Sequence, residues 1–210
     1  MAAQSPTLGN LVSARVQIKG TRILLWNHFG PHALPLEPQE RDGIAGNDPQ
    51  EWRRSVLMNS ERELYVLPSY CFRCLREGGK FLKQGRSNLE KAIASSLRIQ
   101  NKPIYIDGRS VPQQPEYIHN GMFMEVTPEV FIDVSGVVNP STRRRNIRYR
   151  VATAPGWTCS FTVEFDKTII SRSQMHSACI QAGALVGLGD ARQIGLGRFD
   201  LMSFEISDTS

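Results

Sequence analysis

The residues with the most specific spacing in this chain are four glycines near its C-terminus. Two units, Gly187-Leu188-Gly189 and Gly195-Leu196-Gly197, bracket five residues that include Arg192, and Arg198 follows directly. Glycines adopt left-handed backbone angles and permit close approach of another backbone. The spacing predicts a tight loop whose backbone N–H groups and two arginines bind an anion. The lysine and hydroxyl residue of a Walker loop are missing, so no nucleoside-triphosphate site of that kind is expected.

The excess of positive charge is concentrated in one segment of the second half of the chain. The net charge is +5, and residues 139–172 hold seven basic and two acidic side chains. Because arginines bind phosphates by displacing counterions, we expect five main phosphate contacts, Arg143, Arg144, Arg145, Arg148 and Arg150. Secondary contacts are expected along one side of a predicted helix, at Arg73, Lys80 and Lys83. A solvated surface without a ligand is the alternative for both groups.

His28 is the candidate for acid–base chemistry. RNA cleavage without a metal needs a general base to activate the 2′-hydroxyl and a general acid to protonate the departing 5′-oxygen. His28 lies in a loop after the first core segment, with His32 as the second choice. His119 and His176 are less suitable, the latter because it falls on a predicted helix. A loop histidine without a chemical role is the alternative.

No metal or other cofactor is predicted. Cys71 and Cys74 form a C-x-x-C pair inside a predicted helix, while Cys159 and Cys179 stand alone, so we expect buried, reduced thiols. No apolar run has the length of a membrane span, and the first ten residues lack the pattern of a signal peptide. We therefore expect a cytoplasmic protein that does not contact a membrane.

Hydrophobic periodicity predicts the elements that position these groups. Strands are expected over 11–25, 64–67, 104–106, 130–138, 147–152, 157–165 and 199–206, and helices over 48–58, 70–84, 88–97 and 171–185. The remaining predictions are a flexible leader over 1–10, a long loop over 27–48, a tight turn at Asp107-Gly108 and a second long connection over 107–128. This order predicts one domain over residues 1–210, of the α+β class and ferredoxin-like, with inserted loops and a C-terminal glycine-rich loop.

The glycine pattern resembles the Gly-hydrophobic-Gly motif, repeated after five residues that include a basic one, near the C-terminus of the RAMP superfamily. These are the ferredoxin-like RNA-binding proteins of CRISPR effector complexes. Residues 18–29, 64–83 and the strand from Trp157 are similar, in order, to phage and mobile-element relatives of the repeated Cascade backbone subunit. The resemblance implies an RRM-like core with an inserted thumb or palm loop, self-assembly along single-stranded nucleic acid, and no catalytic metal.

Binding without catalysis is the preferred function. The chain is expected to bind single-stranded nucleic acid, with RNA first and DNA left open, and to assemble with copies of itself and with other effector-complex subunits. Exposed aromatic rings stack on bases in such proteins, and the candidates are Trp26, Phe29, Tyr149 and Trp157.

Two alternatives remain. The first is a metal-independent endoribonuclease that processes CRISPR-type repeat RNA with His28. The resemblance supports it, because backbone subunits often lack so complete a glycine loop whereas the repeat-processing nucleases have it. The second is a structural phage or complex subunit that grips its neighbour with the loop over 27–48.

Overall fold

The computed structural model describes residues 10–30, 48–100, 102–121, 128–138, 143 and 145–208. Most of the predicted leader, the greater part of the 27–48 loop with His32, and Arg144 lie outside these residues.

The main sheet has the arrangement of a ferredoxin-like fold. β1 (Leu11–Gly20) lies between β12 (Phe199–Asp208) and β11 (Thr158–Asp166), and β6 (Arg98–Ile99) pairs with the other edge of β11. All three pairings are antiparallel. Along the chain, the sheet and its helices read strand, helix, strand, strand, helix, strand, which confirms the predicted fold class.

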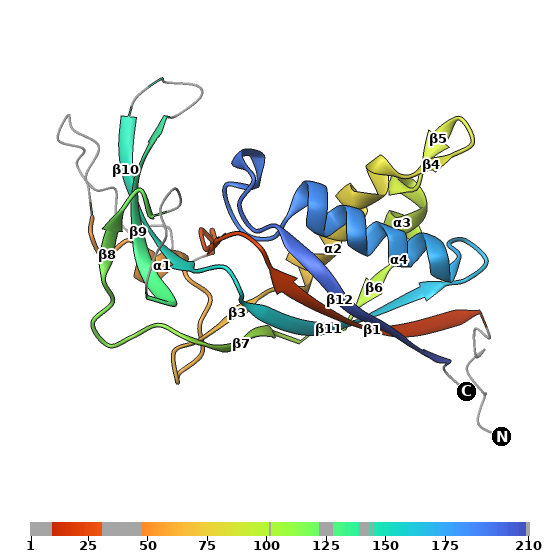
Figure 1. Cartoon of the computed structure of the whole chain (residues 1–210), viewed down its shortest axis with the longest axis horizontal. Coiled ribbons are helices and arrows are strands. Elements are labelled where there is room, and N and C mark those ends of the chain that lie inside the picture. Colours follow the sequence, from red (N-terminus) through yellow and green to blue (C-terminus); the bar gives the residue numbers. More distant parts are fainter. Residues whose placement is uncertain are drawn as a thin grey trace.

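Three helices cover one face of this sheet (Figure 1): α2 (Pro68–Gly78), α3 (Glu90–Ser96) and α4 (Arg172–Gln181). Alternate residues of β1 point into the core between the layers, as predicted from Val12, Ala14, Val16 and Ile18, which are all buried. Ser171 caps α4, because its hydroxyl accepts a hydrogen bond from the Gln174 backbone N–H.

A second sheet stands beside the main one, at the left of Figure 1. Its order is β2 (Leu24–Leu25), β10 (Arg145–Thr153), β9 (Val130–Val138) and β8 (Tyr117–His119). The smaller elements are α1 (Trp52–Ser55), the pair β3 (Glu63–Val66) and β7 (Ile104–Ser110), and the hairpin of β4 (Lys83–Gln84) and β5 (Ser87–Asn88). Since β10 is followed closely by β11, the β9–β10 hairpin is attached directly to the main sheet.

Two predicted helices end earlier than expected. The helix predicted over 70–84 stops at Gly78, and a 3₁₀ turn over Gly79–Phe81 follows. A Cβ atom on Gly78 would lie 2.8 Å from the Ala178 carbonyl oxygen, so this glycine permits close packing of α2 on α4. The helix predicted over 48–58 is reduced to α1, because residues 48–51 form a turn closed by the Glu51 N–H on the Asp48 carbonyl oxygen and the backbone becomes extended at Val56.

Three further predictions are corrected by the structure. Asp107-Gly108 lies inside β7 and not in a tight turn. The stretch over 107–128, predicted to be a connection, holds the end of β7 and the whole of β8, which pairs in parallel with β9. The helix predicted over 171–185 ends at Gln181, and a π-helix over Ala182–Val186 follows it and leaves Leu185 43% exposed. Among the described helices, none has the length and apolar character that a membrane crossing requires.

The glycine-rich loop closes the fold between π-helix and β12, and its four glycines have the predicted left-handed angles. The φ values are 86° at Gly187, 73° at Gly189, 88° at Gly195 and 69° at Gly197. Close backbone approach is also confirmed, because a Cβ atom on Gly189 would lie 2.4 Å from the Leu25 carbonyl oxygen.

The prediction that the loop's N–H groups are open to an anion is wrong for several of them. The N–H groups of Leu188, Asp190 and Gly197 donate to the carbonyl oxygens of Gly197, Leu25 and Ile23, at 2.9, 2.9 and 2.7 Å. The loop therefore uses much of its backbone to attach itself to the segment around β2.

We expect Gly189→Ala to destabilise the protein far more than Gly195→Ala. Both residues have positive φ, so each substitution costs about 1 kcal/mol for the left-handed conformation. Only Gly189 also abuts backbone, since no atom lies within 4 Å of a Cβ atom built on Gly195. Urea unfolding measures both losses of unfolding free energy, and equal losses would contradict the backbone packing described here.

Candidate nucleic-acid interface

Three adjoining pockets surround the glycine-rich loop. The central pocket has a volume of about 150 Å³ and lies over the first half of the loop. The hairpin-side pocket, about 480 Å³, lies toward β9 and β10 and shares Asn27 and Asp190 with the central pocket. The helix-side pocket, about 470 Å³, lies toward the end of α2 and shares Arg192 with the central pocket. The shared residues make the three pockets one continuous surface.

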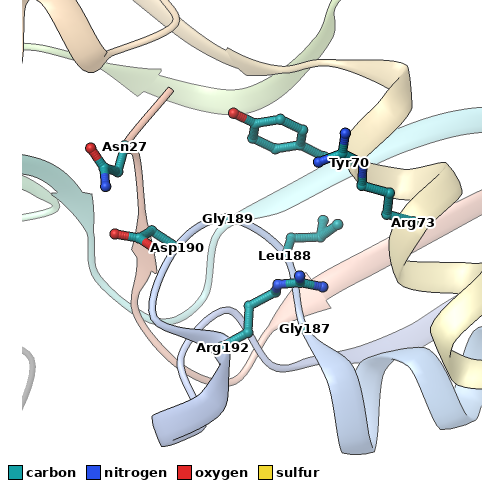
Figure 2. A pocket seen from close by; sticks show the side chains of 8 residues that line it. All are labelled: Asn27, Tyr70, Arg73, Gly187, Leu188, Gly189, Asp190 and Arg192. Atoms are coloured by element: carbon teal, nitrogen blue, oxygen red, sulfur yellow. The ribbon is translucent and has the colours of Figure 1, made fainter. Parts of the chain in front are cut away.

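The central pocket combines two cations with one carboxylate and with the neutral polar side chains of Asn27 and Tyr70. Figure 2 shows Arg73 and Arg192 on one side of it and Asn27 and Asp190 on the other. Arg192 forms an ion pair with Glu77 at 3.1 Å, whereas Arg73 has no ion pair among the described residues. Arg73 lies three residues after Tyr70 on α2, so both side chains project from one face of this helix. The pocket therefore offers an unpaired guanidinium next to a phenol.

Tyr70 also contacts His28, the residue proposed for acid–base chemistry. The Tyr70 hydroxyl lies 3.1 Å from His28 Nδ1, and the His28 backbone N–H donates to the Ser55 carbonyl oxygen at 2.7 Å. Burial raises the pKa of the Tyr70 hydroxyl, with Arg73 acting in the opposite direction, so the phenol stays protonated near neutral pH. The sequence did not suggest this pair, because the two residues are 42 positions apart.

His119 and His176 are both described by the structure, and neither has a contact of this kind. His119 is exposed on β8, and the His176 ring packs edge-on against Phe204 with ring centroids 5.5 Å apart. Neither residue lines any of the three pockets.

Arg150 does not fit the predicted role of a phosphate contact. Its side chain is 5% exposed, and its guanidinium lies 2.8 Å from Asp190 Oδ2 and 3.4 Å from Asp133 Oδ2. It also donates to Ser135 Oγ at 2.7 Å. Two carboxylates thus surround its charge, and the interaction ties the β9–β10 hairpin to the glycine-rich loop.

The remaining arginines of the cluster are more accessible. Arg143 and Arg145 are exposed where the chain enters β10. Arg148 lines the hairpin-side pocket with a side chain that is 44% exposed, although it also pairs with Glu51 at 3.3 Å. We expect these three to be the accessible phosphate contacts of the hairpin.

The predicted row of cations along one helix is interrupted by the end of α2 at Gly78. Arg73 faces the central pocket, Lys80 lines the helix-side pocket and pairs with Glu90 at 3.5 Å, and Lys83 is exposed on β4. Arg198 also lines the helix-side pocket. The cations thus reach different pockets and do not form one continuous stripe.

Two of the four proposed stacking aromatics are in the core. Trp26 and Trp157 are 1% and 0% exposed, and their indole N–H groups donate to the carbonyl oxygens of Tyr65 and Arg22, both at 2.8 Å. They cannot stack on a base. Phe29 is 74% exposed, and Tyr149 is half-buried with an edge contact to Tyr117.

The open face of the main sheet is polar. On β1 it presents Arg15, Gln17 and Lys19, whose partners on β11 in the strand register are Thr162, Ser160 and Thr158. RRM domains stack bases on aromatic residues of this face. These positions hold none, so the loop side of the molecule is the better candidate for the interface.

Within the described part of the chain, no three His, Cys, Asp or Glu side chains are grouped so that they could hold a metal ion. The four cysteines are buried as predicted. Burial raises the pKa of the Cys74 and Cys179 thiols to about 12, so both are protonated near neutral pH.

Neither a protein-family model nor a curated protein sequence matches this chain. Among solved structures, it is similar to a chain of type III-B Cmr-beta bound to cognate target RNA, determined by cryo-EM. The TM-score is 0.50 at 11% sequence identity, and the match covers 94% of this chain and 61% of the other. At this identity the likeness shows a shared fold, and this chain spans less than two thirds of its neighbour.

We expect Arg150→Met to lower the free energy of unfolding by about 3 kcal/mol, because it leaves the fully buried Asp133 without its counter-charge. The double variant Arg150→Met/Asp133→Leu should recover at least half of the loss. Arg148→Met is the matched control, since its pair with Glu51 is partly exposed and should contribute less than about 1 kcal/mol. Denaturant unfolding measures all three variants, and similar losses for the two single variants would contradict a buried charge link.

Proposed function

We propose that this protein binds single-stranded nucleic acid, RNA in the first place, along the surface formed by the β9–β10 hairpin and the glycine-rich loop. One observation carries the proposal. Accessible cations occur along the whole path from the hairpin to the loop: Arg143 and Arg145 are exposed where the chain enters β10, Arg148 lines the hairpin-side pocket, and Arg73 lines the central pocket.

The chemistry of the path suits a flexible, negatively charged strand. Arginines neutralise successive phosphates, and this term supplies most of the affinity in binding that does not read sequence. The hairpin-side pocket is in the size range of small-ligand sites, about 300–1,000 Å³, whereas the central pocket holds little more than a phosphate group. Side-chain amides of Asn27, Asn120 and Asn146 line the hairpin-side pocket and supply donors and acceptors to the strand.

The structural neighbour also supports the proposal of RNA binding, because that chain belongs to Cmr-beta bound to target RNA. We propose that this protein likewise acts as a subunit of a CRISPR-type effector and assembles with copies of itself along the strand. Assembly that grows with strand length supports this role. Assembly at high protein concentration without nucleic acid favours a purely structural subunit instead.

Replacing Arg143, Arg144 and Arg145 together by Gln should weaken binding of a labelled single strand at least about tenfold. The slope of log affinity against log salt concentration should become shallower by about 2, since each lost phosphate contact removes about 0.7 from it. The matched control replaces Arg15, Lys19 and Arg98 by Gln, because these cations are exposed on the main sheet. Anisotropy titrations over a range of salt concentrations measure both effects. If both triple variants lose affinity equally, the hairpin is not the phosphate-binding surface.

A metal-independent endoribonuclease is the second candidate, and the contact between His28 and Tyr70 favours it. His28 supplies a general base for the 2′-hydroxyl, and Tyr70 borders the central pocket with its hydroxyl 3.1 Å from His28 Nδ1. The phenol then holds the imidazole in one orientation, and Arg73 neutralises the phosphate that undergoes attack. As the 2′-oxygen bonds to phosphorus, the bond from phosphorus to the 5′-oxygen breaks, and the departing 5′-oxygen takes its proton from water.

This candidate predicts that wild-type protein cuts RNA in the presence of EDTA and that His28→Ala lowers the single-turnover rate at least about 100-fold, with binding retained. Tyr70→Phe should also slow cleavage, whereas His119→Ala should leave it unchanged. A strand with a 2′-deoxy nucleotide at the cleavage position should remain intact. Binding by the wild type without any cleavage rejects the enzyme and leaves the binding function in place.

A further inference from the structure

The helix-side pocket has an arginine whose charge is not balanced within the described residues. Arg198 Nη1 is buried without a hydrogen-bond partner, and no ion pair to Arg198 is formed in this part of the chain. Burial lowers the pKa of this guanidinium; Cys74 acts in the opposite direction, and the neighbouring charge of Arg192 acts in the same direction as burial. A desolvated cation of this kind is stabilised strongly by an anion that reaches it.

The one carboxylate that lines the pocket is already engaged. Glu77 pairs with Arg192 at 3.1 Å, and Lys80 adds a third cation whose side chain is 48% exposed. Three positive side chains therefore face one negative group around about 470 Å³. Among the three pockets, this one has the largest excess of positive over negative side chains.

Apolar groups line the rest of this pocket, and two helix irregularities expose them. Because α2 ends at Gly78 and a 3₁₀ turn follows, the Phe81 ring is 53% exposed. The π-helix after α4 leaves Leu185 43% exposed. An exposed aromatic ring beside a group of cations is the combination that binds a base and its phosphate in single-strand-binding proteins.

We infer that the helix-side pocket binds one nucleotide of a single strand, with its phosphate on Arg198 and Lys80 and its base against Phe81. The inference rests on the proposed function and extends it, because Arg192 lines both this pocket and the central one. A strand that leaves the hairpin then passes over the glycine-rich loop and continues on the side of α2.

The test measures binding of labelled oligouridylates of increasing length to the full chain. Phe81→Ala and Arg198→Gln should each weaken binding of long strands about tenfold, while the shortest strand that binds should be unaffected. Met202→Ala and Arg98→Gln are the matched controls, since they remove an exposed apolar group and an exposed cation from the main sheet. Circular dichroism and thermal unfolding verify that each variant is folded.

Phe81→Trp supplies a second readout that does not depend on Arg198. The three native tryptophans are buried, so emission from the introduced indole should be quenched when a long strand stacks on it and should not change with the shortest one. If the wild type binds but the two variants match it at every length and no quenching occurs, the inference is overturned and the binding function stands. If the wild type binds no strand, both this inference and the proposed binding function fail.

Discussion

The arrangement of the whole site depends on direct backbone packing between the glycine-rich loop and the segment around β2. A Cβ atom on Gly189 would collide with the Leu25 carbonyl, and the Gly197 N–H donates to the Ile23 carbonyl oxygen at 2.7 Å. No side chain separates these backbones, so the position of the loop is set by hydrogen bonds and steric exclusion. Arg192 and Arg198 are held by this scaffold, because one lies between the glycine pairs and the other follows them.

The same contact joins the two sheets. A small hydrophobic cluster packs Ala191 and Leu196 of the loop against Leu25, Phe131 and Ala152 of the second sheet. Arg150 adds a charged link through Asp190 to this apolar contact. Buried ion pairs often contribute little net stability, but they favour one arrangement over its alternatives, because any other leaves a buried charge unpaired. The orientation of the hairpin relative to the loop is therefore determined by the ion pair as well as by the apolar packing.

The sequence patterns predicted those features of the structure that depend on residues close together in the chain. Alternation in β1 and β11 reports burial on one face of a strand, and the glycine spacing reports left-handed backbone, so both were confirmed. Features that depend on distant partners were not predictable. Trp26 reads equally well as a core or a stacking residue, and its burial is decided by β3 and the Tyr65 carbonyl, 39 positions away.

Phe81 and Arg150 show the same limit of sequence-based prediction: the sequence favours a buried Phe81 and an exposed Arg150, and the structure has the reverse. Phe81 has helical spacing with core residues, but the glycines before it end the helix and the ring becomes exposed. Arg150 alternates with apolar residues as an outward arginine would, yet Asp133 on the neighbouring strand and Asp190 on the loop enclose its charge. A cluster of arginines in a sequence therefore shows how much positive charge a surface can have. How much of that charge stays unpaired depends on where the fold places the carboxylates.

The distribution of carboxylates differs between the main-sheet side and the loop side of this molecule. On the main sheet, the strand register places Arg15 opposite Glu205 and Lys19 opposite Asp200, so positive and negative charges alternate within a few ångströms. Such pairs produce little field beyond a Debye length of about 8 Å at physiological salt. Around the loop, Arg73 and Arg198 have no ion pair within the described chain, and their field extends into the pockets. An approaching polyanion is therefore attracted to the loop side, and the polar sheet face gives it no comparable site.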